Sequence, residues 1–279
     1  MILQLSKINL FLIVLLIISG SIISYLFLFH QKNNELSSEF VRGGWCWFQD
    51  PKAVRFVGEH DRTYIGCTYA GKIMISYYDH ELNKECTPYI VYETGQDDDH
   101  IAPSILILPD GYLLIFWSRH CGDHIHMRRS INPEDISRWE SEQVISGSDN
   151  NCCYTYPIYL EKGRIYLFYR DCTNWNIKWI HSDNDGITWS KPDVIIDFNN
   201  EKYNEAYIKV EARGNKIHLA ASACKHGDWT TYEHIYYAYF DGNNWKKIDG
   251  TILNPPLTPN NMELIFNSGS NTSWIWDIS

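Results

Sequence analysis

Polar and hydrophobic positions alternate over short runs that end at turn residues, from about residue 41 to the end of the chain. Short runs rich in β-branched and aromatic side chains, bounded by Gly, Pro, Asn and Asp, are typical of β-strands. No stretch keeps a helical apolar period for long, so the pattern predicts an all-β fold. The expected strands cover residues 53–57, 62–69, 73–78, 105–108, 112–117, 125–129, 158–160, 164–169, 177–182, 208–212, 216–221 and 236–240.

The strands recur in units of about fifty residues, a period in the range of propeller blades. In each unit a strand and a glycine turn lead to an aromatic-rich strand, then to a third strand that ends in a polar turn and a tryptophan. This order predicts a β-propeller of four-stranded antiparallel blades. The expected blades are 41–95, 97–146, 150–199 and 203–256, and Asn271–Ser279 is expected to begin a fifth, in a ring that is truncated or unusually small.

One turn carries a motif. Ser182–Trp189 (SDNDGITW) resembles the Asp-box of BNR repeats, S-x-D-x-G-x-T-W, with Asn184 in place of the usual aspartate. Such a box is a tight hairpin turn on the outside of a blade. It therefore indicates propeller blades and carries no information about catalysis.

The first residues have a different character, because Ile8–Phe29 is an uninterrupted apolar run of 22 residues. That length is sufficient to cross a bilayer as a helix. Lys7 and Lys32 flank the run, and no convincing cleavage pattern follows it, which favours an uncleaved signal anchor. We expect an anchor at residues 1–33, a polar linker at 34–40 and a propeller at 41–279, held at the membrane outside the cell or in a lumen, or alternatively secreted.

The charge and the cysteine content limit the classes of ligand and partner that the chain is expected to bind. The 24 basic residues include Lys7 and Lys32, so residues 34–279 carry 22 basic against 34 acidic residues, a balance of −12. Nucleic acid is therefore an improbable partner. Eight cysteines are compatible with disulfides in an exported domain, but the absence of a CxxC pair gives a zinc ribbon no support. Asn271 begins a glycosylation sequon.

Candidate chemistry begins with two histidines at the ends of one predicted hairpin. Asp97–His120 holds an acidic run, His100, a strand, the turn Pro109-Asp110-Gly111 and a second strand that ends at His120. Antiparallel strands place these two ends at the same edge of a sheet. We therefore expect the two imidazoles to share one site, although ordinary loop histidines would give the same pattern.

The next unit repeats this arrangement with Tyr154 and Arg170 at the ends of its hairpin. Adjacent blades present the same edge to a central funnel, so the four side chains are expected to converge. The alternatives are a tyrosine that caps a sheet and an arginine that forms an ordinary ion pair with Asp171 or another acid.

At this point the chain resembles the BNR repeat-containing family that includes propeller-type ulvan lyases. The resemblance covers about residues 41–279 and rests on four segments and on two intervals, 20 residues from His100 to His120 and 16 from Tyr154 to Arg170. The segments are Gly43–Pro51 (GGWCWFQDP), Asp98-Asp99-His100, Ser118-Arg119-His120, and Tyr154 with Phe168-Tyr169-Arg170. We expect the chain to lack the family's last blades, and it departs from the family at Asn204–Tyr207, where another arginine-containing strand start is expected.

The resemblance implies β-elimination at a uronic acid of an anionic polysaccharide, sulfated or unsulfated. Arg170 would hold the uronate carboxylate and make the adjacent C5 proton more acidic. His100 and Tyr154 would act as base and acid, in either order, and His120 would orient or protonate. Arg119 or Arg128 would help to hold sulfate or carboxylate groups.

Other readings stay open. A glycan- or protein-binding propeller without turnover is the second, and a sialidase-like hydrolase is the third because the early Arg-Ile-Pro motif is absent. No cofactor is expected. Two weak metal patterns are disfavoured for lack of a complete ligand set. They are His124 with His126, and Cys224 with His226 and His234.

Overall fold

The computed structural model describes residues 43–278, apart from 146–147, 149, 161–162 and 201, and its strands form four antiparallel sheets in chain order. The first sheet holds β1 (Ala53–Val57), β2 (Asp61–Tyr69), β3 (Lys72–Asp79), β4 (Lys84–Glu85) and β5 (Tyr89–Glu93). The second holds β6 (Ser104–Ile107), β7 (Leu113–Trp117), β8 (Ile125–Arg129) and β9 (Gln143–Ile145). The third holds β10 (Cys152–Leu160), β11 (Arg164–Asp171), β12 (Ile177–Ser182) and β13 (Asp193–Ile196). The fourth holds β14 (Glu205–Arg213), β15 (Lys216–Lys225), β16 (Asp228–Phe240), β17 (Trp245–Lys246), β18 (Ile252–Leu253) and β19 (Glu263–Phe266).

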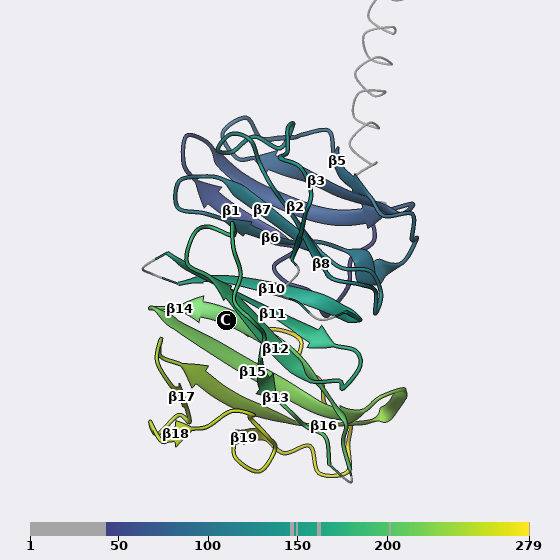
Figure 1. Cartoon of the computed structure of the whole chain (residues 1–279), viewed down its shortest axis with the longest axis vertical. Helices are drawn as coiled ribbons and strands as arrows, with labels where there is room; N and C mark the ends of the chain where they lie inside the picture. Colours follow the sequence, from purple (N-terminus) through teal and green to yellow (C-terminus); the bar gives the residue numbers. More distant parts are fainter. Residues whose placement is uncertain (1–42, 146–147, 149, 161–162, 201, 279) are drawn as a thin grey trace, which may run out of the picture. The chain divides into compact units, whose positions relative to one another are not determined.

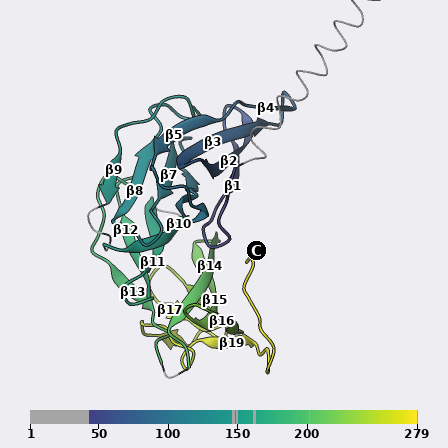
Figure 2. The same cartoon turned by 90° about the vertical axis from the view of Figure 1, so that its right-hand side faces the viewer.

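The sheets are arranged like consecutive blades. Figure 1 shows them following one another from β1 to β19, and Figure 2 shows that they lie along an arc. The first strand of each sheet contacts the first strand of the next, β1 with β6, β6 with β10 and β10 with β14. This arrangement confirms the all-β prediction and is consistent with a propeller.

Strand β7 shows how the sequence builds the packing between blades. All five of its residues, LLIFW, are buried. Because side chains alternate across a strand, Ile115 and Trp117 pack in a hydrophobic cluster with residues of the first sheet, whereas Leu114 and Phe116 pack in a cluster with residues of the third. A continuous apolar run is therefore the pattern of a strand that is covered on both faces.

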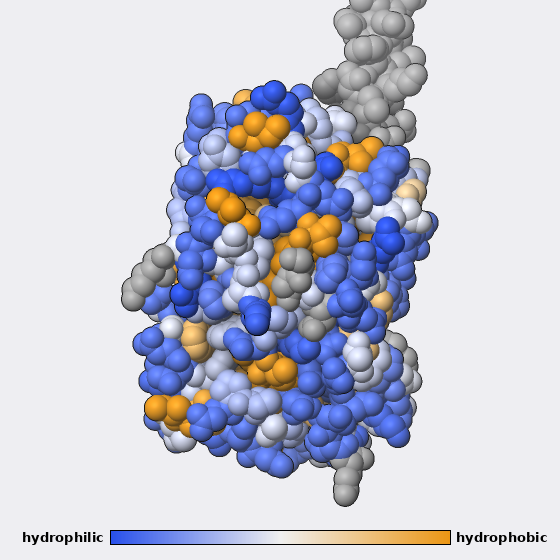
Figure 3. Space-filling model, viewed as in Figure 1, coloured by the Kyte–Doolittle hydropathy of each residue, from blue (hydrophilic) through white to orange (hydrophobic). Residues whose placement is uncertain are grey.

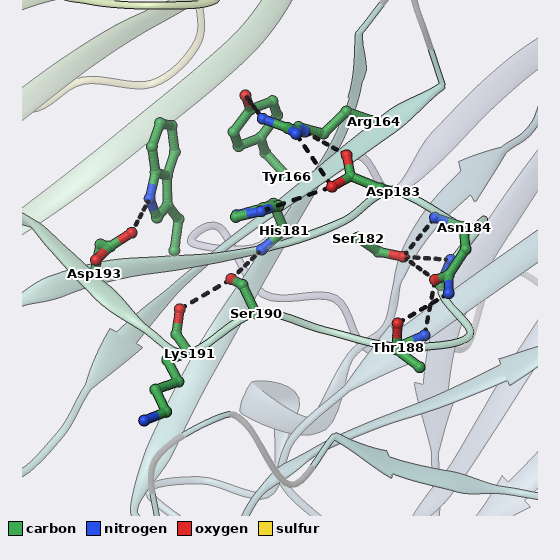
Figure 4. Close-up of polar contacts among 12 residues, drawn as sticks. Arg164, Tyr166, His181, Ser182, Asp183, Asn184, Thr188, Ser190, Lys191 and Asp193 are labelled. Carbon is green, nitrogen blue, oxygen red and sulfur yellow. Dashed lines mark hydrogen bonds and ion pairs between the residues drawn. The ribbon is translucent and has the colours of Figure 1, made fainter.

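The Asp-box forms the hairpin turn that its sequence predicts (Figure 4). The Ser182 hydroxyl accepts from the Gly186 amide at 2.9 Å, and the Asn184 side-chain oxygen accepts from the Thr188 amide at 2.9 Å. Asn184 replaces the usual aspartate without loss of that bond, and its amide nitrogen adds a bond to the Thr188 hydroxyl at 2.9 Å. Gly186 is required by its φ of +85° and by Leu114, whose Cδ2 would lie 2.9 Å from an added Cβ.

The structure corrects several strand limits. Strands β10, β14, β15 and β16 extend well beyond the predicted apolar runs, because their polar and cysteine-bearing ends are also paired or buried. The described part of the predicted fifth-blade strand, residues 271–278, forms no strand. Instead Trp274 stacks on Tyr232 at 4.1 Å, and β19, which the pattern did not predict, pairs with β16.

Within residues 43–278 as described, no helix is long and apolar enough to cross a membrane. The predicted anchor at residues 1–33 and the linker at 34–40 lie outside the described residues. Figure 3 shows a mostly hydrophilic face with separate hydrophobic patches on the described part. Scattered patches of this kind are normal for a protein surface.

Candidate active site

His100 and His120 lie side by side, as the hairpin pattern predicts. Their ring centroids are 3.7 Å apart and the ring planes differ by 4°. His100 lies in a single 3₁₀ turn, Asp99–Ile101, whose N-cap residue Asp98 accepts from the His100 amide at 2.8 Å. His120 follows β7, and its amide donates to the Gln96 side chain at 3.2 Å. The backbone therefore fixes both histidines.

Asp98 holds both imidazoles. One carboxylate oxygen lies 2.7 Å from His100 Nδ1 and the other lies 3.0 Å from His120 Nδ1, and Asp99 also approaches His100 Nδ1 at 2.7 Å. Partial burial raises the pKa of Asp98, but the bonds from the His100 amide and the two imidazoles outweigh it and hold the pKa well below its usual range. An ionised carboxylate only accepts, so Nδ1 of each histidine carries a proton. In a neutral imidazole the Nε2 lone pair is then available.

Tyr154 is placed by a bulge. The β10–β11 register shifts between Cys153 and Tyr156, and Tyr154 has a φ of +60°, which is unusual for a residue other than glycine. The bulge turns its ring toward His100, with ring centroids 5.4 Å apart. Tyr154 is only 2% exposed, and this burial raises its pKa, although Arg170 opposes the shift.

Arg170 lies over the Tyr154 ring, with Cζ 4.3 Å from the ring centroid. Its Nη1 donates to the Glu205 carboxylate and, at 3.0 Å, to the Tyr207 hydroxyl, while Nη2 lies 3.1 Å from Cys153 Sγ. Burial alone would lower the pKa of Arg170, but Cys153 and Glu205 raise it well above its usual value. The guanidinium is therefore charged, paired and only 2% exposed.

The structure thus brings four predicted residues into one row: His120, His100, Tyr154 and Arg170, called the His–Tyr–Arg row below. The row departs from the expected carboxylate clamp, because Glu205 already occupies the guanidinium of Arg170. Exposure increases along the row from Arg170 to His120, whose side chain is 40% exposed.

Arg119 and Arg128 point elsewhere. Arg119 Nη2 lies 3.4 Å from the Thr94 carbonyl oxygen, and Arg128 Nη1 donates to the Val91 carbonyl oxygen at 2.7 Å. Both guanidinium groups therefore bond to the chain at the end of the first sheet. Their role in substrate binding stays a prediction.

Sequence reasoning missed two carboxylates of this site. Asp98 was noted within an acidic run and within the family-like segment Asp98-Asp99-His100, without a role of its own, and Glu205 stood where an arginine-containing segment was expected. The available signal was their position, since Asp98 precedes the first strand of its sheet and Glu205 begins that of another, while Tyr154 lies near the start of the first strand of the third sheet. The pairing of Glu205 with Arg170 joins residues 35 apart and could not be read from local spacing.

Three thiols lie beside the row. Cys121, Cys153 and Cys172 place their sulfur atoms within 4.8 Å of one another, a donor set suited to a soft divalent ion such as zinc. Hydrogen bonds from Cys153 and Cys172 lower the pKa of Cys121, whereas burial raises that of Cys153 to about 12. The eight cysteines form no disulfide. Asp98, His100 and His120 form a second group with metal-ligand spacing.

The histidines of the two disfavoured metal patterns bond to other groups. His124 and His126 bond to the Ser148 carbonyl oxygen at 3.0 Å and to Glu142 at 2.6 Å, respectively. His226 bonds to Glu205, whereas His234 lies 3.2 Å from the Ser268 hydroxyl. Neither pattern therefore gathers its members around one point.

The four blade-like sheets give the chain a β-propeller-like fold, and the row lies near the strand ends of the middle sheets. A family model described as "BNR repeat-containing family member" matches residues 62–276, and the chain belongs to this family. This membership confirms the resemblance that the sequence motifs indicate.

Known proteins extend the comparison. An ulvan lyase of Alteromonas sp. (strain LOR) is 25% identical over 194 residues, 58% of this chain and 39% of the lyase. A PL25 ulvan lyase structure bound to -[GlcA(1-4)Rha3S]- has a TM-score of 0.69 and 19% identity, and the match covers 81% of this chain and 60% of that one. The arabinanase Arb43A of Bacillus subtilis has a TM-score of 0.54 and 14% identity, with 85% and 87% covered. The chain thus spans less than two thirds of either lyase's length.

Proposed function

We propose that the protein is a polysaccharide lyase that cleaves a uronate-containing glycan, sulfated or not, by β-elimination. The observation that carries the proposal is the His–Tyr–Arg row, in which two imidazoles, a phenol and a guanidinium are in continuous contact. Similarity to ulvan lyases in sequence and fold supports the choice of an acidic glycan.

His100 is the proposed base. The carboxylates of Asp98 and Asp99 hold its Nδ1 proton, so the Nε2 lone pair is available to take the C5 proton of a uronate. This is the orientation that a carboxylate gives to the basic imidazole of a catalytic dyad. His100 is also partly exposed, which allows contact with a sugar.

Tyr154 is the proposed proton donor for the leaving O4, with His120 as an orienting residue or second donor. Burial raises the pKa of Tyr154 and keeps the phenol protonated at neutral pH, which suits an acid better than a base. Arg170 would act through Tyr154, placing a fixed positive charge behind the ring as negative charge develops on the substrate.

A non-catalytic glycan-binding propeller is the second candidate, and burial favours it. Tyr154 is packed under Phe48, with ring centroids 5.2 Å apart, and Arg170 is neutralised by Glu205. Turnover requires the phenol to reach the substrate, so a rigidly covered Tyr154 would leave only the exposed imidazoles to bind sugar.

The test is to incubate the purified protein with ulvan, glycosaminoglycans and pectins and to follow the absorbance of unsaturated uronate. The proposal predicts a rise with at least one acidic glycan that is lost in His100→Ala and in Tyr154→Phe. His218→Ala is the control, because His218 lies on β15 and bonds to Tyr237 instead of the row. Binding without any rise, in protein shown to be folded, would favour the second candidate.

We also propose that the apolar run Ile8–Phe29 anchors the propeller on the side of the membrane where polysaccharides occur. The proposal rests on the length of the run and on an acidic glycan as substrate. Protease digestion of intact cells should remove the propeller, and its full protection would contradict this placement.

A further inference from the structure

A third exposed imidazole lies beyond the Arg170 end of the His–Tyr–Arg row. His226 follows β15 just as His120 follows β7, so the two histidines leave the second strands of their sheets at corresponding places. Its backbone amide donates to the Asn204 side chain at 2.7 Å, which fixes the start of the loop. The side chain of His226 is 43% exposed.

Glu205 connects His226 to the row. One oxygen of this carboxylate accepts from Arg170, and the other lies 3.0 Å from His226 Nδ1. The Glu205 side chain is 1% exposed, so it is held between the two groups away from water. Because a carboxylate only accepts, Nδ1 carries a proton and the Nε2 edge of His226 is the one left to meet a ligand.

Trp175 supplies a ring beside this imidazole. The Trp175 and His226 centroids are 3.7 Å apart with planes 20° apart, and Arg170 Cζ lies 5.1 Å from the Trp175 ring. Trp175 has a φ of +59°, a backbone conformation that costs energy and persists only where the surroundings hold it. The contacts therefore continue unbroken from His120 through Arg170 to His226.

The charges at this end favour an anion. Arg170 and Glu205 neutralise each other, so no uncompensated buried carboxylate repels an anionic ligand at this end. The neighbouring Lys225 is exposed and contributes a positive charge. Residues 34–279 carry a balance of −12, so a local positive edge stands out against the field of the rest of the domain.

We propose that His226 and Trp175 form a second sugar-binding subsite, which takes the carboxylate or sulfate of a residue flanking the one at His100. In this subsite the edges of the stacked indole and imidazole contact the sugar ring, and the doubly protonated form of His226 donates from Nε2 to its acidic group. Glu205 is a positioning residue that acts through His226. The inference rests on the proposed function and adds a second place where the protein binds an acidic group of the same glycan.

The test uses oligosaccharides prepared from ulvan and the same material after carboxyl reduction and desulfation, titrated calorimetrically into the whole protein. His226→Gln is expected to weaken binding of the acidic form roughly tenfold, the usual worth of one charge-assisted hydrogen bond, and to leave the neutral form unchanged. His226→Lys restores a cation and should recover most of the affinity. His218→Gln, on the strand that precedes His226, is the matched control.

Kinetics separate this inference from the proposed function. His226→Gln should raise KM with little change in kcat, whereas His100→Ala should abolish elimination. Acid-selective binding that depends on His226 in a protein without elimination would overturn the lyase and keep the subsite. Elimination with equal KM and equal affinity in His226→Gln and wild type would overturn the subsite and keep the lyase. Thermal unfolding of each variant shows whether lost affinity reflects lost structure.

Discussion

Asp98 and Glu205 hold imidazoles at the two ends of the His–Tyr–Arg row, and their surroundings differ. Asp98 is partly exposed and bonds to two stacked histidines, whereas Glu205 is buried and bonds to one histidine and a buried arginine. A partly exposed carboxylate allows its histidines to exchange protons with a substrate. A buried carboxylate paired with a guanidinium has a fixed charge, so it can only position its partners. We therefore assign proton transfer to the Asp98 end and binding to the Glu205 end.

The largest expected effect is on catalysis at the Asp98 end. His100→Ala removes the proposed base, so kcat should fall by about 10²–10⁴-fold, the usual contribution of a general acid or base. Stopped assays of unsaturated product measure this, with His218→Ala as the control. If the variant keeps nearly full kcat, the base is another residue.

At the Glu205 end the largest expected effect is on stability. Glu205→Gln leaves the buried Arg170 charge without its partner, so the free energy of unfolding should fall by about 3–5 kcal/mol. Urea unfolding followed by tryptophan fluorescence measures the loss. If the variant is as stable as the wild type, the carboxylate does not compensate the guanidinium as described.

A smaller effect is expected on the pH dependence of stability, through Asp98. The pKa of Asp98 in the folded protein lies below its ordinary value of about 3.9, so its ionised form stabilises the fold above that pH and the gain is lost as pH falls through the folded pKa. Asp98→Asn should therefore be less stable than wild type at pH 7 and converge with it in acid. Parallel stability curves for the two proteins from pH 7 to pH 2 would contradict this sign.

The smallest expected effect is the loss of stability at an exposed ion pair, which serves as a reference for the buried pair. Asp183, the second residue of the Asp-box, pairs with Arg164 at the surface, with N–O distances of 2.5 and 3.1 Å (Figure 4). An exposed pair of this kind contributes about 0–1 kcal/mol. Asp183→Asn should thus change the unfolding free energy by less than one third of the Glu205→Gln effect, and a comparable loss would show that burial is not what distinguishes the pairs.

The sequence predicts the blade bodies well, because an alternating apolar pattern indicates a strand buried on one face and a continuous apolar run indicates a strand buried on both. The LLIFW run of β7 and the alternating strands around it are explained by packing on neighbouring sheets, and the SDNDGITW turn keeps its geometry with Asn184 because an amide oxygen accepts the same bond. The ends of the strands are harder to predict, since Cys152, Cys153 and Glu205 are buried by tertiary contacts that their polarity does not indicate.

The candidate site could be predicted only in part for the same reason. His100, His120, Tyr154 and Arg170 were found because they flank hairpins that the topology brings to one edge. The burial of Tyr154 and Arg170, and the bonds of Glu205 to Arg170 and His226, join different sheets across long sequence separations. Such contacts depend on the bulge in β10 and on how the sheets pack, which local patterns do not encode.

The most direct test of the central claim is mass spectrometry of the products formed from ulvan by the wild-type protein. Elimination predicts fragments with an unsaturated uronate at the new non-reducing end, each lighter by one water than the corresponding hydrolysis product, and none from His100→Ala. Saturated fragments that have gained water would contradict the account and would make the protein a hydrolase built on the same fold.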